Sequence, residues 1–89
     1  MKILTNHSLI QTIKLCESDE ELDQLLIGLL TPQEIEVIAT RIEIARRLLK
    51  GESQRSVAKN LGIGIATVTR GAREVRIGRF PVLSRTNSN

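Results

Sequence analysis

Residues 51–73 read GESQRSVAKNLGIGIATVTRGAR, two short runs of helical apolar spacing separated by a glycine turn. In the first run, Ser53 can cap a helix with its hydroxyl, and Val57 and Leu61 fall on one face of that helix. Gly62 tolerates the positive φ with which many helices end, so a second helix can follow it. The stretch therefore predicts a helix-turn-helix.

Two further spacings agree with such a motif over about residues 53–73. Ala58 precedes the turn glycine by four residues, where a small side chain lets two helices cross closely. Val68 follows the same glycine by six residues, where the second helix must dock onto the first. The alternative is a purely structural helical hairpin, because any two amphipathic helices joined by glycine share much of this pattern.

The composition favours a small all-α domain. The 89 residues include no Trp or Tyr and one Phe, which leaves Leu, Ile, Val and Ala to build the core. Because Phe80 is the only aromatic ring, recognition of single strands by stacking on bases is nearly excluded. A chain of this length is near the lower limit for a self-sufficient core, so association with a second copy is expected.

Charge is distributed unevenly along the chain, whose formal net charge is +3. Residues 1–45 carry eight acids and three bases, a net charge of −5, whereas residues 46–89 carry two acids and ten bases, a net charge of +8. Lys and Arg that neutralise phosphates release counterions, so the second half suits a polyanion. Charge alone would favour a solvated basic surface, but its coincidence with the helix-turn-helix favours DNA.

Several classes of site and location are disfavoured. Cys16 is single, and its spacing from His7 is not that of a metal site. There is no Ser/His/Asp set, carboxylate pair or phosphate-binding loop, so we expect no enzyme. No apolar run approaches the roughly 20 residues of a membrane span, and the amino terminus lacks a signal-peptide pattern. We therefore expect a cytoplasmic protein without a metal or a membrane partner.

Helix-start signals divide the amino-terminal part into three helices. The first is expected from Asn6, the second after a capping box at Ser18-Asp-Glu-Glu21, and the third after Thr31-Pro-Gln-Glu34. The third helix runs to a glycine stop at Gly51 and carries apolar residues on more than one stripe. It should therefore be buried on two sides, one of which a second subunit can supply.

After the motif the helical pattern weakens. Glu74 to Ile77 can extend the last helix, but Gly78, Pro81 and a polar ending predict a basic, largely disordered tail over residues 79–89. This tail either contacts the DNA backbone or has no role. One domain is therefore expected over residues 1–78.

The second helix of the motif is expected to enter the major groove of double-stranded DNA with its amino end first. Its leading residues Ile65, Ala66 and Thr67 are then the candidate base-reading residues, through methyl, hydroxyl and water-bridged contacts. Residues around them are candidates for phosphate or flanking-base contacts, each with the alternative of a solvated helix surface. These are Gln54, Arg55, Lys59, Thr69 and Arg73.

The runs LLTPQE, from Leu29, and ATRIEIARRLLKGESQRSVAKNLGIGIATVTRG, from Ala39, resemble the Trp repressor family of bacterial operon repressors. The resemblance covers about residues 22–71. It implies an all-helical, intertwined homodimer whose two reading heads address the halves of a palindromic operator. It also implies that free L-tryptophan, bound between the head and the dimer core, acts as corepressor.

The resemblance further implies a set of ligand contacts. Arg41 and Arg70 match the arginines that sandwich the indole and hold the carboxylate, and planar guanidinium groups suit both tasks. Gly71 matches the glycine beside the ring. The segment that closes the pocket from the other subunit is matched by Gly28, Leu30 and Thr31.

The chain departs from the family pattern at three places. Glu74 replaces a serine that faces the amino group of the ligand, so it either pairs with an ammonium or bonds Arg70. The loop at residues 51–53 is shorter than in tryptophan-binding members, and the last helix of the family is not recognisable. Arg41 also has an alternative, an ion pair with Glu43 or with Glu34 of the partner subunit.

The sequence therefore predicts a dimeric bacterial transcriptional regulator that binds operator DNA as a sequence-specific repressor, with L-tryptophan as a candidate corepressor. Two alternatives stay open. One is a ligand-independent or differently triggered member of the same family. The other is a basic helical module that binds an acidic protein and no DNA.

Overall fold

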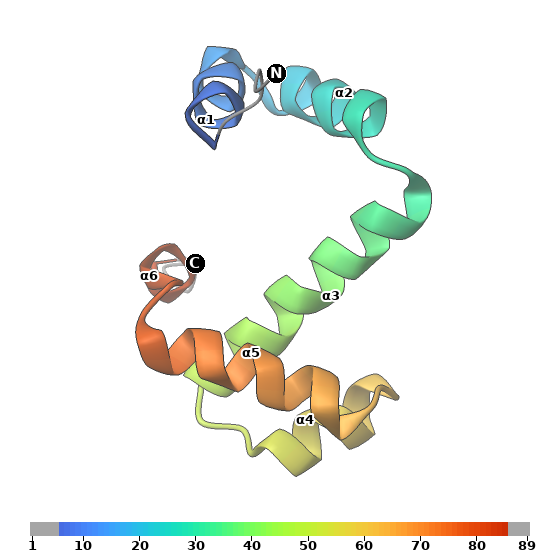
Figure 1. Cartoon of the computed structure of the whole chain (residues 1–89), viewed down its shortest axis with the longest axis vertical. Helices are drawn as coiled ribbons and strands as arrows, with labels where there is room; N and C mark the ends of the chain where they lie inside the picture. The colour runs from blue at the N-terminus through green and yellow to red at the C-terminus, as the bar shows by residue number, and fades with distance from the viewer. Residues whose placement is uncertain (1–5, 86–89) are drawn as a thin grey trace, which may run out of the picture. The chain divides into compact units, whose positions relative to one another are not determined.

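A computed structural model describes residues 6–85, which form six helices and no strand within that range. They follow one another along the chain in Figure 1 as α1 (Asn6–Leu15), α2 (Asp19–Leu29), α3 (Pro32–Leu49), α4 (Gln54–Leu61), α5 (Ile65–Ile77) and α6 (Pro81–Ser84). The predicted all-α fold is confirmed. Residues 1–5 and 86–89, the latter from the predicted tail, lie outside the described range.

The chain divides into two compact units, residues 1–36 and 37–89. In the first unit, the hydroxyl of Ser18 accepts a hydrogen bond of 3.1 Å from the backbone N–H of Glu21. The backbone N–H of Thr31 donates to Glu34 over 2.9 Å, and the N–H of Glu34 donates back to the Thr31 hydroxyl over 3.1 Å. Both predicted helix starts are thus confirmed, because these bonds satisfy N–H groups that have no partner within the helix.

The first unit leaves much of its apolar surface uncovered. None of its described residues is buried, and Leu9, Ile10 and Leu29 are 51%, 55% and 57% exposed. Single exposed leucines are ordinary, but a helical unit in which no apolar residue is buried is not. This surface therefore lacks a cover within the described chain.

The second unit has a core that joins three helices. Ile44 of α3, Val57 of α4 and Val68 of α5 are buried against one another, and Leu48, Ala58, Leu61 and Ile63 pack around them. In Figure 1, α4 and α5 lie beside the carboxyl-terminal end of α3. The positions that the sequence predicted for the packing of the two motif helices are confirmed.

The turn between α4 and α5 has the predicted chemistry. The hydroxyl of Ser53 accepts a hydrogen bond of 3.1 Å from the N–H of Ser56 at the start of α4. Gly62 ends α4 with φ 65°, and its N–H points to the carbonyls of Ala58 and Lys59. The helix-turn-helix is therefore confirmed, and we call residues 54–77 the head.

The central helix α3 is buried at its carboxyl-terminal end only. Ile44 and Ala45 are 1% and 0% exposed, whereas Val37, Ile38, Ile42 and Leu49 are each between 40% and 47% exposed. The second unit supplies one of the two buried sides that the apolar pattern predicted. Burial of the other side of α3, by a second subunit, stays a prediction.

The segment after α5 differs from the predicted disordered tail. Gly78 ends α5 with φ 90°, and residues 81–84 then form α6, with Leu83 only 9% exposed. Pro81 stands at the start of α6, where its fixed φ favours a helix. The polar ending concealed this turn, because one buried leucine is a weak signal in sequence.

Candidate nucleic-acid interface and adjoining pocket

The first turn of α5 presents the three predicted base-reading residues. Ile65 is 52% exposed, and Ala66 and Thr67 are also exposed, whereas Val68 in the same turn is fully buried. Val68 fixes this turn on the core, while the other three residues of the turn stay exposed, Thr67 on the side that faces the pocket described below. The amino end of α5 is thus an uncovered helix end, anchored on the core by Val68 and made of mostly apolar side chains.

Three of the predicted phosphate contacts are basic residues on the two helices of the head, Arg55 and Lys59 on α4 and Arg73 on α5. Arg55, Lys59 and Arg73 are exposed, and no ion pair within residues 6–85 engages them. Their charges are therefore available to an external anion.

The other two predicted contacts bind each other. The Thr69 hydroxyl donates a hydrogen bond of 2.9 Å to Oε1 of Gln54, the first residue of α4. The pair connects the amino end of α4 to α5 across 15 positions of sequence. Sequence reasoning placed both residues at the interface but had no signal for their contact.

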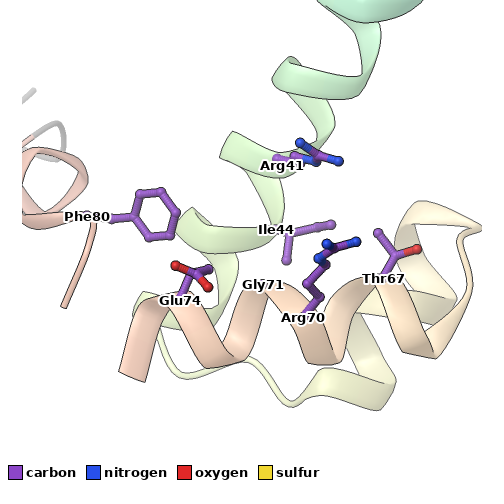
Figure 2. Close-up of a pocket in the computed structure, with 7 residues that line it drawn as sticks. All are labelled: Arg41, Ile44, Thr67, Arg70, Gly71, Glu74 and Phe80. Atoms are coloured by element: carbon purple, nitrogen blue, oxygen red, sulfur yellow. The ribbon is translucent and has the colours of Figure 1, made fainter. Parts of the chain in front are cut away.

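A pocket of about 290 Å³ lies between α3 and α5. Figure 2 shows Thr67, Arg70 and Glu74 projecting from α5 toward α3, with Arg41 across the pocket and the Phe80 ring at one end. Ile44 and Gly71 complete its lining. Four of the residues that the family resemblance assigned to the ligand, two arginines, a glycine and a glutamate, therefore line one cavity.

Gly71 allows the close approach of the two helices beneath this pocket. A Cβ atom at this position would lie 2.8 Å from Cγ2 of Ile44, closer than side-chain atoms pack. Ile44 is 1% exposed and packed in the core, so this contact would force α3 and α5 to shift or Ile44 to change its packing. The glycine that the resemblance placed beside a ring therefore also sets the separation of α3 and α5.

The two arginines of the pocket have no ion pair within the described part of the chain. Glu43, which the sequence offered as an alternative partner for Arg41, instead contacts Arg46 at 3.7 Å and Arg47 at 2.9 Å. Two guanidinium groups thus face the cavity without a carboxylate of their own.

Glu74 has a partner that the sequence did not predict. Its carboxylate contacts Nε of Arg79 at 3.3 Å, and not the guanidinium of Arg70. Arg79 and Phe80 follow the Gly78 turn, so the chain itself supplies one end of the pocket. Phe80 was not predicted as a pocket residue; being the only aromatic residue was the one signal that could have drawn attention to it.

The remaining predicted ligand residues lie in the first unit. Gly28 is in α2, Leu30 follows that helix, and Thr31 caps α3. The resemblance assigned them to the pocket of a second subunit, so their contribution to a ligand site stays a prediction.

A polar cluster around Glu52 connects α3, the loop and α4. Nη1 of Arg47 contacts the Glu52 carboxylate at 3.3 Å, and the Ser56 hydroxyl and the Asn60 amide each donate to it over 2.8 Å. These contacts lower the pKa of Glu52, first through the hydrogen bond from Ser56. The pKa of Arg47 is raised, first by its hydrogen bond to Glu43. The short loop is therefore tied to both helices that it joins.

The Glu52 cluster predicts a dependence of stability on pH. A carboxyl whose pKa is lower in the folded state stabilises the fold above its unfolded pKa of about 4.3 and loses that contribution as pH falls through the lowered value. Glu52→Gln should therefore lower the urea midpoint at pH 7, and the difference from the parent protein should shrink on acidification. Glu36→Gln, at an exposed position of α3, is the matched control and should show no such convergence. An equal difference at pH 7 and pH 3 would contradict the role of the ionised carboxylate.

The described part of the chain holds neither a metal site nor a membrane-spanning helix. No group of three or more His, Cys, Asp or Glu side chains in residues 6–85 is placed to hold a metal ion. Over the same range, no helix combines the length and the apolar character needed to cross a bilayer.

Comparisons with known proteins point to one family. The family described as Trp repressor protein matches residues 5–80. A "Trp operon repressor homolog" of Vibrio vulnificus (strain YJ016) is 43% identical over 70 residues, which cover 78% of this chain and 69% of that relative. The homolog of Vibrio cholerae is 41% identical over 68 residues, covering 75% and 66% of the two chains. That of Aliivibrio fischeri (strain MJ11) is 47% identical over 53 residues, covering 58% and 49%. No solved structure matches the chain.

Proposed function

The chain belongs to the Trp repressor family, whose members are transcription regulators and not enzymes, and from this premise we propose that it represses transcription by binding operator DNA as a homodimer. Such a regulator acts in the bacterial cytoplasm, where the operator is. The observation that carries the proposal is the amino end of α5, which is exposed on its leading face and fixed on the core by Val68.

Base reading is assigned to the first turn of α5. An α-helix fits the major groove, and there its leading residues meet the edges of the base pairs. Ile65 and Ala66 offer methyl groups to thymine, and the hydroxyl of Thr67 can donate or accept, directly or through water. Arg55, Lys59 and Arg73 supply charges for the phosphates on either side.

Dimerisation is supported by the apolar surface that the chain leaves uncovered. The exposed apolar residues of α1 and α2 in the first unit, and those of α3 in the second, each lack a cover that a second copy can provide. Two copies of the head would address two half-sites about 34 Å apart, one turn of the duplex. The operator is then expected to be palindromic.

A small-molecule corepressor is supported by the pocket. Two guanidinium groups without a carboxylate partner, on Arg41 and Arg70, suit a ligand that has both a carboxylate and a flat ring. The volume of the pocket, about 290 Å³, is near the lower end of the range for small-molecule sites, roughly 300–1,000 Å³. We propose L-tryptophan as this ligand, with Gly71 beside the ring and Gly28, Leu30 and Thr31 contributed by the second subunit.

A ligand-independent repressor is the second candidate, and the ion pair of Glu74 with Arg79 favours it. This carboxylate is the group that would have to receive the ligand's ammonium, and the chain already provides it with a cation at 3.3 Å. Phe80 also takes part of the space at that end of the pocket. In that case the chain itself would set the angle of α5.

The DNA part of the proposal is tested with duplexes chosen from a random library and with random duplex as competitor. Affinity for both should fall steeply between about 50 and 200 mM salt, and the selected duplex should bind at least about a thousandfold tighter. Salt-insensitive binding, or no preference for the selected duplex, would contradict sequence-specific recognition of DNA. No duplex binding at all would favour a protein-interaction module.

Two substitutions then separate base reading from phosphate contact. Thr67→Ala should weaken binding to the selected duplex by about 1–2 kcal/mol and binding to random duplex much less, because only the selected duplex presents a matched base edge. Arg55→Ala should weaken both duplexes and reduce the salt slope by about 0.9, because one phosphate contact is lost. Equal losses for the two duplexes in Thr67→Ala would mean that the groove-facing assignment is wrong.

A further inference from the structure

The hydrogen bond between Thr69 and Gln54 decides which of the two side chains still has a donor for a DNA phosphate. The Thr69 hydroxyl has one proton, and that proton is donated to Oε1 of Gln54 at 2.9 Å. Phosphate oxygens accept hydrogen bonds and do not donate them. A hydroxyl whose proton is already used therefore has nothing to offer a phosphate.

The same bond leaves the opposite edge of the Gln54 amide available. A glutamine amide has an accepting oxygen and an NH₂ group with two donors. With its oxygen held by Thr69, the amide is oriented and Nε2 is directed away from that contact. No hydrogen bond within residues 6–85 engages Nε2, so both of its protons are available.

The place of the pair fits a phosphate contact. Gln54 is the first residue of α4 and is half-buried, with the exposed Arg55 next to it in the chain. The backbone N–H groups of a first helical turn add positive potential there. A neutral amide at this point can donate a hydrogen bond to a phosphate of the DNA backbone without releasing a counterion from the DNA.

We propose that Thr69 is a positioning residue, which acts on DNA by holding the Gln54 amide so that Nε2 donates to a backbone phosphate. The inference rests on the proposed function, because it assigns roles within the same DNA-binding head. It makes Gln54 the contacting residue of the pair and Thr69 the residue that orients it.

A double-mutant cycle on the selected duplex tests this dependence. Thr69→Val keeps the shape and removes the hydroxyl, and it should weaken binding about threefold to tenfold, the range of one net hydrogen bond. In the Gln54→Ala background the same change should have almost no effect, because there is no amide left to orient. Thr69→Ser should restore binding to within about twofold of the parent. Additive losses in the cycle would overturn the proposal.

Two further readouts separate this role from a loss of folding or a general loss of DNA binding. Gln54→Glu keeps an acceptor for Thr69 but has no donor, so it should weaken binding at least as much as Gln54→Ala. Single phosphates of the selected duplex can be neutralised by replacing them with methylphosphonates. At one position this replacement should weaken binding of the parent protein and leave binding of Gln54→Ala unchanged. If the parent binds a selected duplex but no such position exists, the inference fails and DNA binding stands. If the parent binds no duplex, both fail.

Discussion

Replacing Val68 with aspartate should unfold the head and abolish binding to any duplex. Val68 is 0% exposed and packs with Ile44 and Val57, so a carboxylate at this position would have no water and no cation within the core. An unpaired buried charge destabilises by roughly 3–5 kcal/mol, a large part of the 5–15 kcal/mol that holds a typical domain together. Because three helices meet at this residue, the loss removes the support of α4 and α5 together.

Circular dichroism and duplex titration measure the two consequences. Val68→Asp should lose helical signal at 25 °C and bind neither the selected nor the random duplex. The matched control is Ile77→Asp, which adds the same charge to the same helix where the side chain is 54% exposed. It should keep its helical signal. A folded Val68→Asp protein would mean that the three-helix core is not what supports the reading face.

The sequence was most informative where one local rule decides the structure. The capping boxes at Ser18 and Thr31 fix helix starts through hydrogen bonds between residues three apart, and Gly62 fixes the turn through its positive φ. The burial of Val57 followed from helical spacing, and that of Val68 from its distance of six residues after the turn glycine. Such features need no knowledge of distant parts of the chain.

The sequence was least informative where side chains far apart in the chain meet. The bond between Thr69 and Gln54 joins residues 15 positions apart and depends on the crossing angle of α4 and α5, which periodicity does not give. The partner of Glu74 was also missed, because Arg79 lay in a segment expected to be disordered. For the pocket itself, family resemblance and not spacing identified Arg41, Arg70 and Gly71.

The second large effect concerns the ligand. Isothermal calorimetry with L-tryptophan should give a micromolar dissociation constant for the parent protein, and Arg70→Ala should weaken it by roughly 10-fold to 150-fold. That range corresponds to the 1.5–3 kcal/mol of one hydrogen bond to a charged group. Arg76→Ala, which removes an exposed arginine of the same helix that does not line the pocket, is the matched control. Silence of the parent protein at millimolar tryptophan would leave the ligand-independent repressor as the better account.

The role of Glu74 follows from comparing L-tryptophan with indole-3-propionate, which has the same ring and carboxylate but no ammonium. If the carboxylate leaves Arg79 to receive the ammonium, Glu74→Gln should lower the affinity for L-tryptophan only, because only that ligand loses a charged partner. If it stays with Arg79 and merely occupies space, Glu74→Gln should change both affinities alike. Arg79→Ala also separates the two cases, because it frees the Glu74 carboxylate. If Glu74 accepts the ammonium, this variant should bind L-tryptophan more tightly than the parent protein does, and its affinity for indole-3-propionate should not rise.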